Sequence, residues 1–108
     1  MCADNVFYNV NKIVVAQGFE CSYIDFSREL NEYLLRNYPG YYLGLQLYQD
    51  NCNCNLFHVV ATYNNICGVY EAARFIGNDI NSIYERIWGE CVDRTSVFSF
   101  LTSTRVVC

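Results

Sequence analysis

This chain of 108 residues has one lysine, one histidine and no long apolar run, and each scarcity excludes a class of protein. Seven basic residues stand against eleven acidic ones, so the formal net charge is −4. Strong non-specific binding to nucleic acid is therefore disfavoured, because it depends on basic side chains that displace counterions from phosphates. No segment approaches the ~18 consecutive apolar residues that a membrane-spanning helix needs, so we expect no membrane span.

Catalytic signatures are also missing from the sequence. There is no G-x-S-x-G motif, no glycine-rich phosphate loop and no clustered pair of acidic residues. Cys67 is the one candidate nucleophile, because we expect it in the first turn of a helix, where the helix dipole favours a thiolate. His58 is the only conventional base, and it falls on the outward face of a predicted strand. We therefore predict a protein that is not an enzyme and that holds no cofactor.

The cysteines and the histidine do not predict a metal site. Cys52, Cys54 and His58 form a C-x-C-x₃-H pattern that Cys67 follows, and zinc requires four such ligands in tetrahedral geometry. In an extended strand, however, Cys54 and His58 lie roughly 13 Å apart. No C-x₂-C pair is present, so we expect a polar turn with incidental thiols and no bound metal.

Seven cysteines cannot all pair within one chain, because their number is odd. We interpret them as reduced thiols that act as small hydrophobic side chains in a cytoplasmic protein. The first residues, MCADNVFYNV, lack the basic start and apolar run of a secretory signal, which agrees with an intracellular location. An extracellular domain whose signal has been removed stays open as an alternative, with Cys2 or Cys108 free to link chains.

The composition is that of a folded protein, with 53% hydrophobic and 17% aromatic residues, and its length is typical of one domain over residues 1–108. Alternation and helical periodicity predict an α+β fold: an antiparallel sheet with helices on one face, in the order β-α-β-β-αα-β and ferredoxin-like in outline. The predicted elements are a strand over 6–16 that slips near Asn11–Lys12, a helix over 25–38, a hairpin over 41–63, two helices within 64–88 and a strand over 96–107.

The stretch from Asn64 to Trp88 carries two apolar stripes at helical spacing, one on each side of Gly77. Because glycine adopts the left-handed conformation of a helix C-cap without steric cost, Gly77 is predicted to end the first helix. Asn78 and Asp79 then offer a cap for the second. The stripe residues are Ile66, Val69, Tyr70, Ala73 and Ile76 before the glycine, and Ile80, Ile83, Tyr84 and Ile87 after it.

Residues 68–90 resemble the helix-turn-helix of excisionase-type proteins and of DNA-binding modules attached to homing endonucleases. The matching positions are Glu71, Ala72, Ala73, Gly77, Ser82, Ile83, Tyr84 and Gly89. The resemblance implies a DNA-binding regulator that uses residues 66–88, with Asn81, Ser82 and Arg86 near the groove. The C-terminal part of the chain is the more nearly neutral one, which leaves contact with nucleic acid possible there.

Ten tyrosines are the most unusual feature of the composition. Tyr41, Tyr42, Tyr48 and Tyr63 cluster on the predicted hairpin, and exposed tyrosine is typical of protein interfaces. The leading hypothesis is therefore a small, acidic, non-catalytic protein that binds another protein through these tyrosines and self-associates. Such a chain would suit a viral or phage accessory protein that inhibits a host factor. The alternatives are the DNA-binding regulator and a self-assembling structural protein.

Overall fold

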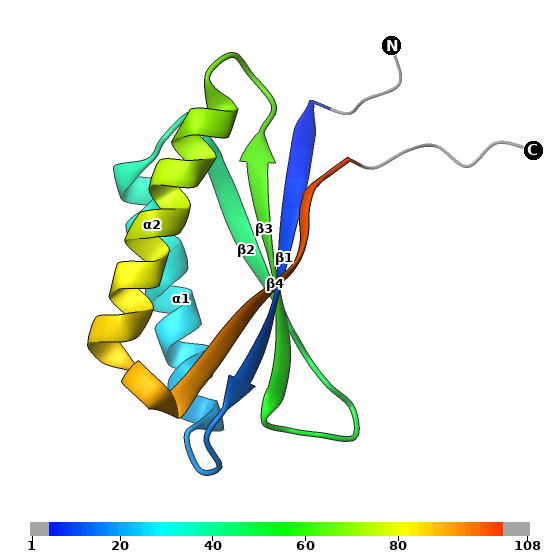
Figure 1. The fold of residues 1–108 in the computed structure, drawn as a ribbon, viewed down its shortest axis with the longest axis vertical. Coiled ribbons are helices and arrows are strands. Elements are labelled where there is room, and N and C mark those ends of the chain that lie inside the picture. Colours follow the sequence, from blue (N-terminus) through cyan, green and yellow to red (C-terminus); the bar gives the residue numbers. More distant parts are fainter. Residues whose placement is uncertain (1–4, 103–108) are drawn as a thin grey trace, which may run out of the picture.

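A computed structural model describes residues 5–102 and shows one antiparallel sheet with two helices on the same face (Figure 1). The strand order is β2-β3-β1-β4, which confirms the predicted ferredoxin-like α+β class. One hydrophobic core fills the space between the sheet and the helices. The elements are β1 (Val6–Val15), α1 (Glu20–Asn37), β2 (Tyr42–Gln49), β3 (Leu56–Asn64), α2 (Val69–Ile87), a 3₁₀ turn (Gly89–Cys91) and β4 (Val92–Leu101).

The central strand β1 keeps strict alternation along its whole length. Phe7, Ile13 and Val15 are buried against the helices, and Asn9 and Asn11 continue the same face between them. The slip predicted within this strand is wrong, because β1 pairs with β3 in an unbroken register from Val6 to Val14. The irregularity belongs to the pairing with β4, which shifts twice opposite residues 8–11.

The predicted hairpin is present as β2 and β3, and Phe57, Val59, Ala61 and Tyr63 form the buried face of β3. In β2, strict alternation would place Leu43, Leu45 and Leu47 on one face, but the strand departs from it. A register shift between Tyr42 and Gly44 gives β2 one extra residue, Leu43. Tyr42, Leu45 and Leu47 therefore share the core face, while Leu43 is exposed.

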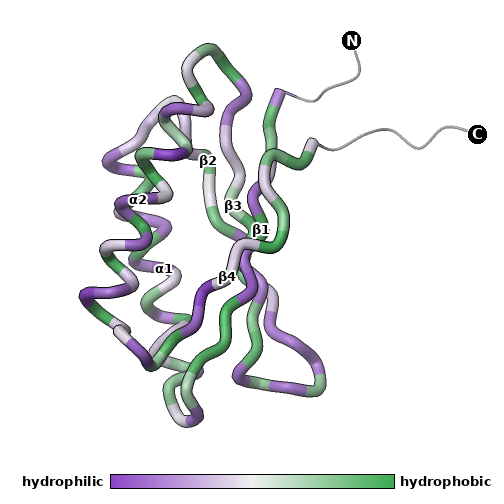
Figure 2. Tube along the Cα trace, viewed as in Figure 1, coloured by the Kyte–Doolittle hydropathy of each residue, from purple (hydrophilic) through white to green (hydrophobic). Residues whose placement is uncertain are grey.

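The first helix begins earlier than the sequence indicated, at Glu20 and not near Asp25. Its buried residues are Tyr23, Phe26, Ser27, Leu30 and Leu34. It ends at Asn37, before Pro39–Gly40, as predicted. Hydrophobic and hydrophilic residues alternate along both helices (Figure 2), and the buried ones among the hydrophobic residues belong to the core.

The prediction of two helices around Gly77 is wrong, because α2 is one continuous helix of 19 residues. Gly77 lies in its middle and does not have a positive φ. A glycine inside a helix costs only about 1 kcal/mol relative to alanine, and burial of the surrounding apolar face outweighs that cost. The buried face runs without a break across the glycine and comprises Val69, Ala73, Ile76, Ile80, Ile83 and Tyr84.

Within residues 5–102, no helix is both long and apolar enough to cross a membrane.

The predicted strand over 96–107 is realised as β4, which begins earlier, at Val92. Its last predicted residues, from 103 onward, lie outside the described part of the chain.

Candidate active site

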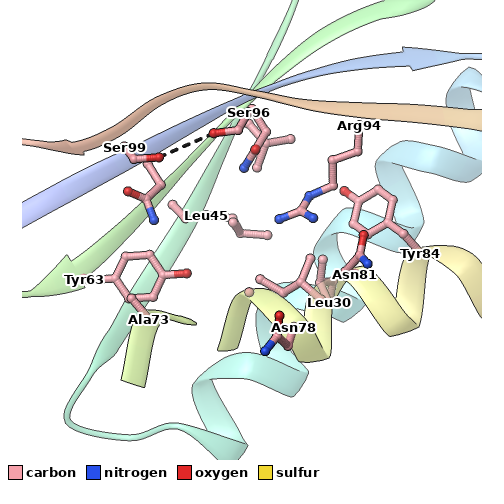
Figure 3. A pocket seen from close by; sticks show the side chains of 16 residues that line it. Leu30, Leu45, Tyr63, Ala73, Asn78, Asn81, Tyr84, Arg94, Ser96 and Ser99 are labelled. Atoms are coloured by element: carbon pink, nitrogen blue, oxygen red, sulfur yellow. Dashed lines mark hydrogen bonds between the residues drawn. The ribbon is translucent and has the colours of Figure 1, made fainter. Parts of the chain in front are cut away.

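A cavity of about 400 Å³ lies between the inner face of the sheet and helix α2 (Figure 3). This volume falls in the range of roughly 300–1,000 Å³ that is typical of small-molecule sites. Apolar residues form part of its wall, and amide, hydroxyl and guanidinium groups form the rest. The lining residues are Asn9, Asn11, Leu30, Leu45, Val59, Ala61, Tyr63, Ala73, Gly77, Asn78, Ile80, Asn81, Tyr84, Arg94, Ser96 and Ser99.

The cavity exists because small and polar residues meet where larger apolar ones would fill the space. Ala61 of β3 pairs with Asn9 of β1 on the inner face of the sheet. Across the gap, α2 presents Ala73 and Gly77, which are four residues apart and therefore on one side of the helix. A Cβ placed on Gly77 would meet nothing within 4 Å, so this part of the layer is left open.

Two hydrogen-bonding groups in the cavity are held in place and remain able to bind a ligand. The Asn9 Oδ1 accepts a hydrogen bond from the Phe100 N–H at 2.8 Å, which leaves the Asn9 amide N–H groups as donors. The Tyr63 hydroxyl points into the cavity (Figure 3). Burial raises the pKa of Tyr63 to about 12, so its hydroxyl is a protonated donor at neutral pH.

A buried pair of tyrosines forms one end of the site. The hydroxyls of Tyr23 on α1 and Tyr84 on α2 lie 2.6 Å apart. Burial raises the pKa of both tyrosines, so the pair is neutral. The Arg94 guanidinium lies over the Tyr84 ring, 5.3 Å from its centroid, in a cation–π contact. Tyr84 is thereby fixed both at its hydroxyl and on its ring face.

The residues considered for metal binding and cysteine chemistry lie away from this cavity. His58 sits on the opposite face of the sheet, paired with Lys12 and Tyr48. Cys67 precedes α2 and lies outside its first turn, contrary to the prediction. Cys52 and Cys54 are exposed in the β2–β3 turn. Among residues 5–102, no three metal-ligating side chains gather at one point.

The four hairpin tyrosines do not share one surface. Tyr42 and Tyr63 are each only 2% exposed and belong to the core, whereas Tyr48 is 56% exposed on the other face of the sheet. Tyr41 is half-buried. Alternation assigns Tyr63 to the buried face of β3 correctly, but it misassigns Tyr42, because the extra residue in β2 reverses the face on which Tyr42 lies.

The residues proposed for DNA contact lie on a single helix and not on a helix-turn-helix. Asn81, Ser82 and Arg86 are all exposed on α2, and Asn81 borders the cavity. The arrangement on which the DNA-binding hypothesis depended, two helices that cross at Gly77, is replaced by the continuous α2. Of the four arginines from residue 66 onward, Arg94 lines the cavity and Arg105 lies outside the described residues.

Two solved structures match the fold over almost its whole length, and both proteins carry the provisional name antibiotic biosynthesis monooxygenase. The one from Bacteroides thetaiotaomicron VPI-5482 has a TM-score of 0.61 and 14% identity, over 95% of this chain and 97% of its own. The one from Bordetella bronchiseptica has the same TM-score and identity, over 96% and 100%. Comparison with protein-family models and with curated proteins returned no match.

This likeness corrects the function that the sequence predicted. The prediction of a non-catalytic protein that binds partners, of a viral accessory kind, is contradicted by a fold shared with two proteins named as monooxygenases. The prediction that the chain is not an enzyme is contradicted by the same finding. Sequence reasoning looked for charged or nucleophilic motifs and missed a site built from asparagine, tyrosine and one arginine. The available signal was Asn9 and Asn11, two polar residues on the otherwise apolar inner face of β1.

Proposed function

We propose that the protein is a monooxygenase that acts on a small organic molecule bound in the cavity between the sheet and α2. The observation that carries this proposal is a cavity of about 400 Å³ with mixed apolar and polar walls, within a fold like that of two proteins named as monooxygenases. Monooxygenation places one atom of O₂ in the product and reduces the other to water. The electrons come from the substrate itself or from a separate donor such as a reduced flavin.

The residues of the cavity would bind and orient the substrate and keep water away from it. Leu45, Val59 and Ile80 provide apolar surface for a hydrocarbon ring or chain. The Tyr63 hydroxyl and the amide of Asn9 offer hydrogen bonds to carbonyl or hydroxyl oxygens. Groups fixed in this way lower the entropic cost of holding the substrate in a reactive orientation.

Oxygen consumption with a panel of hydroxylated aromatic compounds of one to three rings tests the proposal. Each compound is assayed alone and with a reduced flavin, and products are checked by mass spectrometry for one oxygen atom derived from ¹⁸O₂. We expect turnover of at least one compound by the wild type. Gly77→Leu places a side chain in the cavity, because a Cβ there has open space, and should abolish turnover while the fold is retained.

Arg74→Leu, an exposed substitution on the same helix, is the matched control and should keep full turnover. Turnover that persists unchanged in Gly77→Leu would place the reaction outside this cavity. Absence of any ¹⁸O-labelled product across the panel, with and without the electron donor, would count against monooxygenase function.

We propose self-association through the outer face of the sheet, which includes Tyr48 of the four hairpin tyrosines but neither Tyr42 nor Tyr63. Both helices cover the other face (Figure 1), and Val60, Val10 and Phe98 form one apolar row across β3, β1 and β4. Phe98 is 54% exposed, and Tyr48 and Leu101 extend the same face. Lys12 and Asp93 add one charge of each sign, which a second copy related by a two-fold axis could pair.

Light scattering coupled to size exclusion tests this second proposal. Phe98→Glu should convert a dimer into a monomer, because a carboxylate would be buried at the centre of the interface. Phe75→Glu changes an exposed aromatic on α2 and should leave the dimer intact. A wild-type chain that is monomeric at high micromolar concentration would refute the proposal.

We propose that the chain resides in a reducing compartment such as the cytoplasm, because its described cysteines are free thiols. The five cysteines of the described residues are unpaired and exposed: Cys21, Cys52, Cys54, Cys67 and Cys91. Exposed thiols of this kind persist where glutathione keeps cysteine reduced. Alkylation of protein in its source cells, followed by mass spectrometry, should label all seven cysteines without prior reduction. A disulfide found under those conditions would contradict this location.

A further inference from the structure

Arg94 is placed on the core face of the sheet by the register of β4. It pairs with the fully buried Ile13 of β1 and lies two residues from the buried Val92, so its side chain enters the layer between sheet and helices. Figure 3 shows its guanidinium pointing into the cavity. A charged group in such a position is costly unless it is paired, so its immediate surroundings determine what it can bind.

The cavity offers Arg94 no negative partner. Within residues 5–102 the one ion pair joins Arg28 to Asp25 on the surface of α1. No aspartate, glutamate, histidine or cysteine is among the residues that line the cavity. The guanidinium lies over the Tyr84 ring, and it makes no hydrogen bond or ion pair with any of residues 5–102, so its N–H donors remain available to a ligand.

The surrounding groups reinforce a preference for an oxyanion. Tyr63 and Asn9 are donors on the same cavity, and the high pKa of Tyr63 keeps its proton in place at neutral pH. The cavity holds donors and a positive charge within a protein whose net charge is −4. The preference for an anion must therefore come from the groups inside the cavity, since the overall negative charge of the protein repels anions at long range.

We propose that Arg94 anchors an aromatic oxyanion, a carboxylate or a phenolate, and that this group defines the substrate class of the cavity. The proposal rests on the proposed function for the location of the site and adds the chemistry of what binds there. The guanidinium fork would hold the oxyanion, while the ring would lie against Leu45, Val59 and Ile80.

The same lining implies that the substrate is already ionised when it binds. A proton taken from the substrate inside the cavity would need an acceptor, and the ionisable side chains that line it are two protonated tyrosines and one arginine. Neither type accepts a proton at neutral pH. Compounds that are anions in solution are therefore expected to bind better than neutral compounds of the same shape.

Calorimetric binding with two matched pairs of probes tests the proposal without any turnover. The pairs are 2-naphthoate with 2-naphthamide, and 2,4-dinitrophenolate with 2,4-dinitroanisole, each measured on the full chain at pH 7. We expect at least one anion to bind about tenfold or more tightly than its neutral partner, as hydrogen bonds to a charged group allow. Arg94→Gln should reduce that ratio to near one, and Arg94→Lys should restore part of it.

Arg74→Gln is the matched control, because it removes an exposed arginine and should keep the wild-type ratio. Preference for only one of the two anions would support the proposal and identify the group as a carboxylate or a phenolate. An equal ratio in the wild type and Arg94→Gln, both shown to be folded by circular dichroism, would overturn it. Arg94-dependent binding, together with no ¹⁸O-labelled product across the compound panel, would count against the proposed function and leave this inference standing.

Discussion

At the scale of single residues, the Tyr23–Tyr84 hydroxyl pair joins the two helices at the end of the cavity. Both side chains are buried, and their hydroxyls are 2.6 Å apart. Removing one hydroxyl leaves the other without its partner in the core, whereas removing both leaves neither. The losses in the free energy of unfolding that the two single substitutions cause should therefore not add in the double substitution.

Tyr23→Phe and Tyr84→Phe are each expected to lower the free energy of unfolding by about 1–3 kcal/mol. The double variant should lose clearly less than the sum of the two single losses. Urea unfolding of the four proteins at neutral pH measures this coupling. Tyr48→Phe, at an exposed tyrosine, should change nothing. Strictly additive losses would show that the two hydroxyls do not bond to each other.

At the scale of elements, α2 shows how one glycine can be compatible with two different structures. Gly77 has helical backbone angles and open space at its Cβ position, so alanine fits there without strain. Gly77→Ala should raise the free energy of unfolding by about 0.5–1 kcal/mol, because glycine inside a helix loses more backbone entropy. A helix-turn-helix with a left-handed Gly77 would give the opposite sign.

The control for this substitution is Gly68→Ala, just before α2. Gly68 has a φ of +85°, and a Cβ there would lie 3.4 Å from the Tyr41 hydroxyl, so alanine should destabilise the protein. Thermal unfolding followed by circular dichroism compares the two variants directly. A fall in Tm for both variants would indicate that Gly77 forms a turn and does not lie inside a helix.

The sequence was sufficient to predict most elements and their class, since alternation in β3 and periodicity in α1 reflect burial directly. It also contained evidence for one helix in place of two. The stripe of Val69, Ala73, Ile76, Ile80 and Ile83 keeps the same phase through Gly77, as a single helix requires. Two helices that cross at a turn have no need for that continuity.

The site could not be predicted because it depends on which residues face each other across layers. Asn9 and Asn11 of β1, Gly77 of α2 and Arg94 of β4 are far apart in the chain, and none belongs to a catalytic motif. Arg94 faces inward only because β4 joins β1 in the register that pairs it with Ile13. Local patterns do not specify that pairing.

At the scale of the whole molecule, the buried tyrosines predict how stability changes at high pH. Burial raises the pKa of Tyr63 to about 12, and it also raises the pKa of Tyr23, Tyr42 and Tyr84, compared with about 10 in an unfolded chain. Above pH 10 the unfolded chain releases protons that the folded chain retains. Stability should therefore be unaffected by these groups below pH 10 and fall as pH rises from 10 through 12.

A spectrophotometric titration of the phenolates, with circular dichroism on the same samples, measures this effect. The exposed tyrosines should ionise first, without loss of structure, and the buried ones should ionise together with unfolding. Conversion of all ten tyrosines near pH 10 in a protein that stays folded would contradict the burial of the central four.

The asparagines on the inner face of β1 have a consequence for how this protein could be engineered. Replacing Asn9 and Asn11 by isoleucine would complete the apolar inner face of the central strand and remove two of the polar groups that line the cavity. The product should be a more stable protein that no longer offers these amides to a ligand. The two polar residues thus record a trade-off in which the chain gives up part of its attainable stability to keep an interior space open.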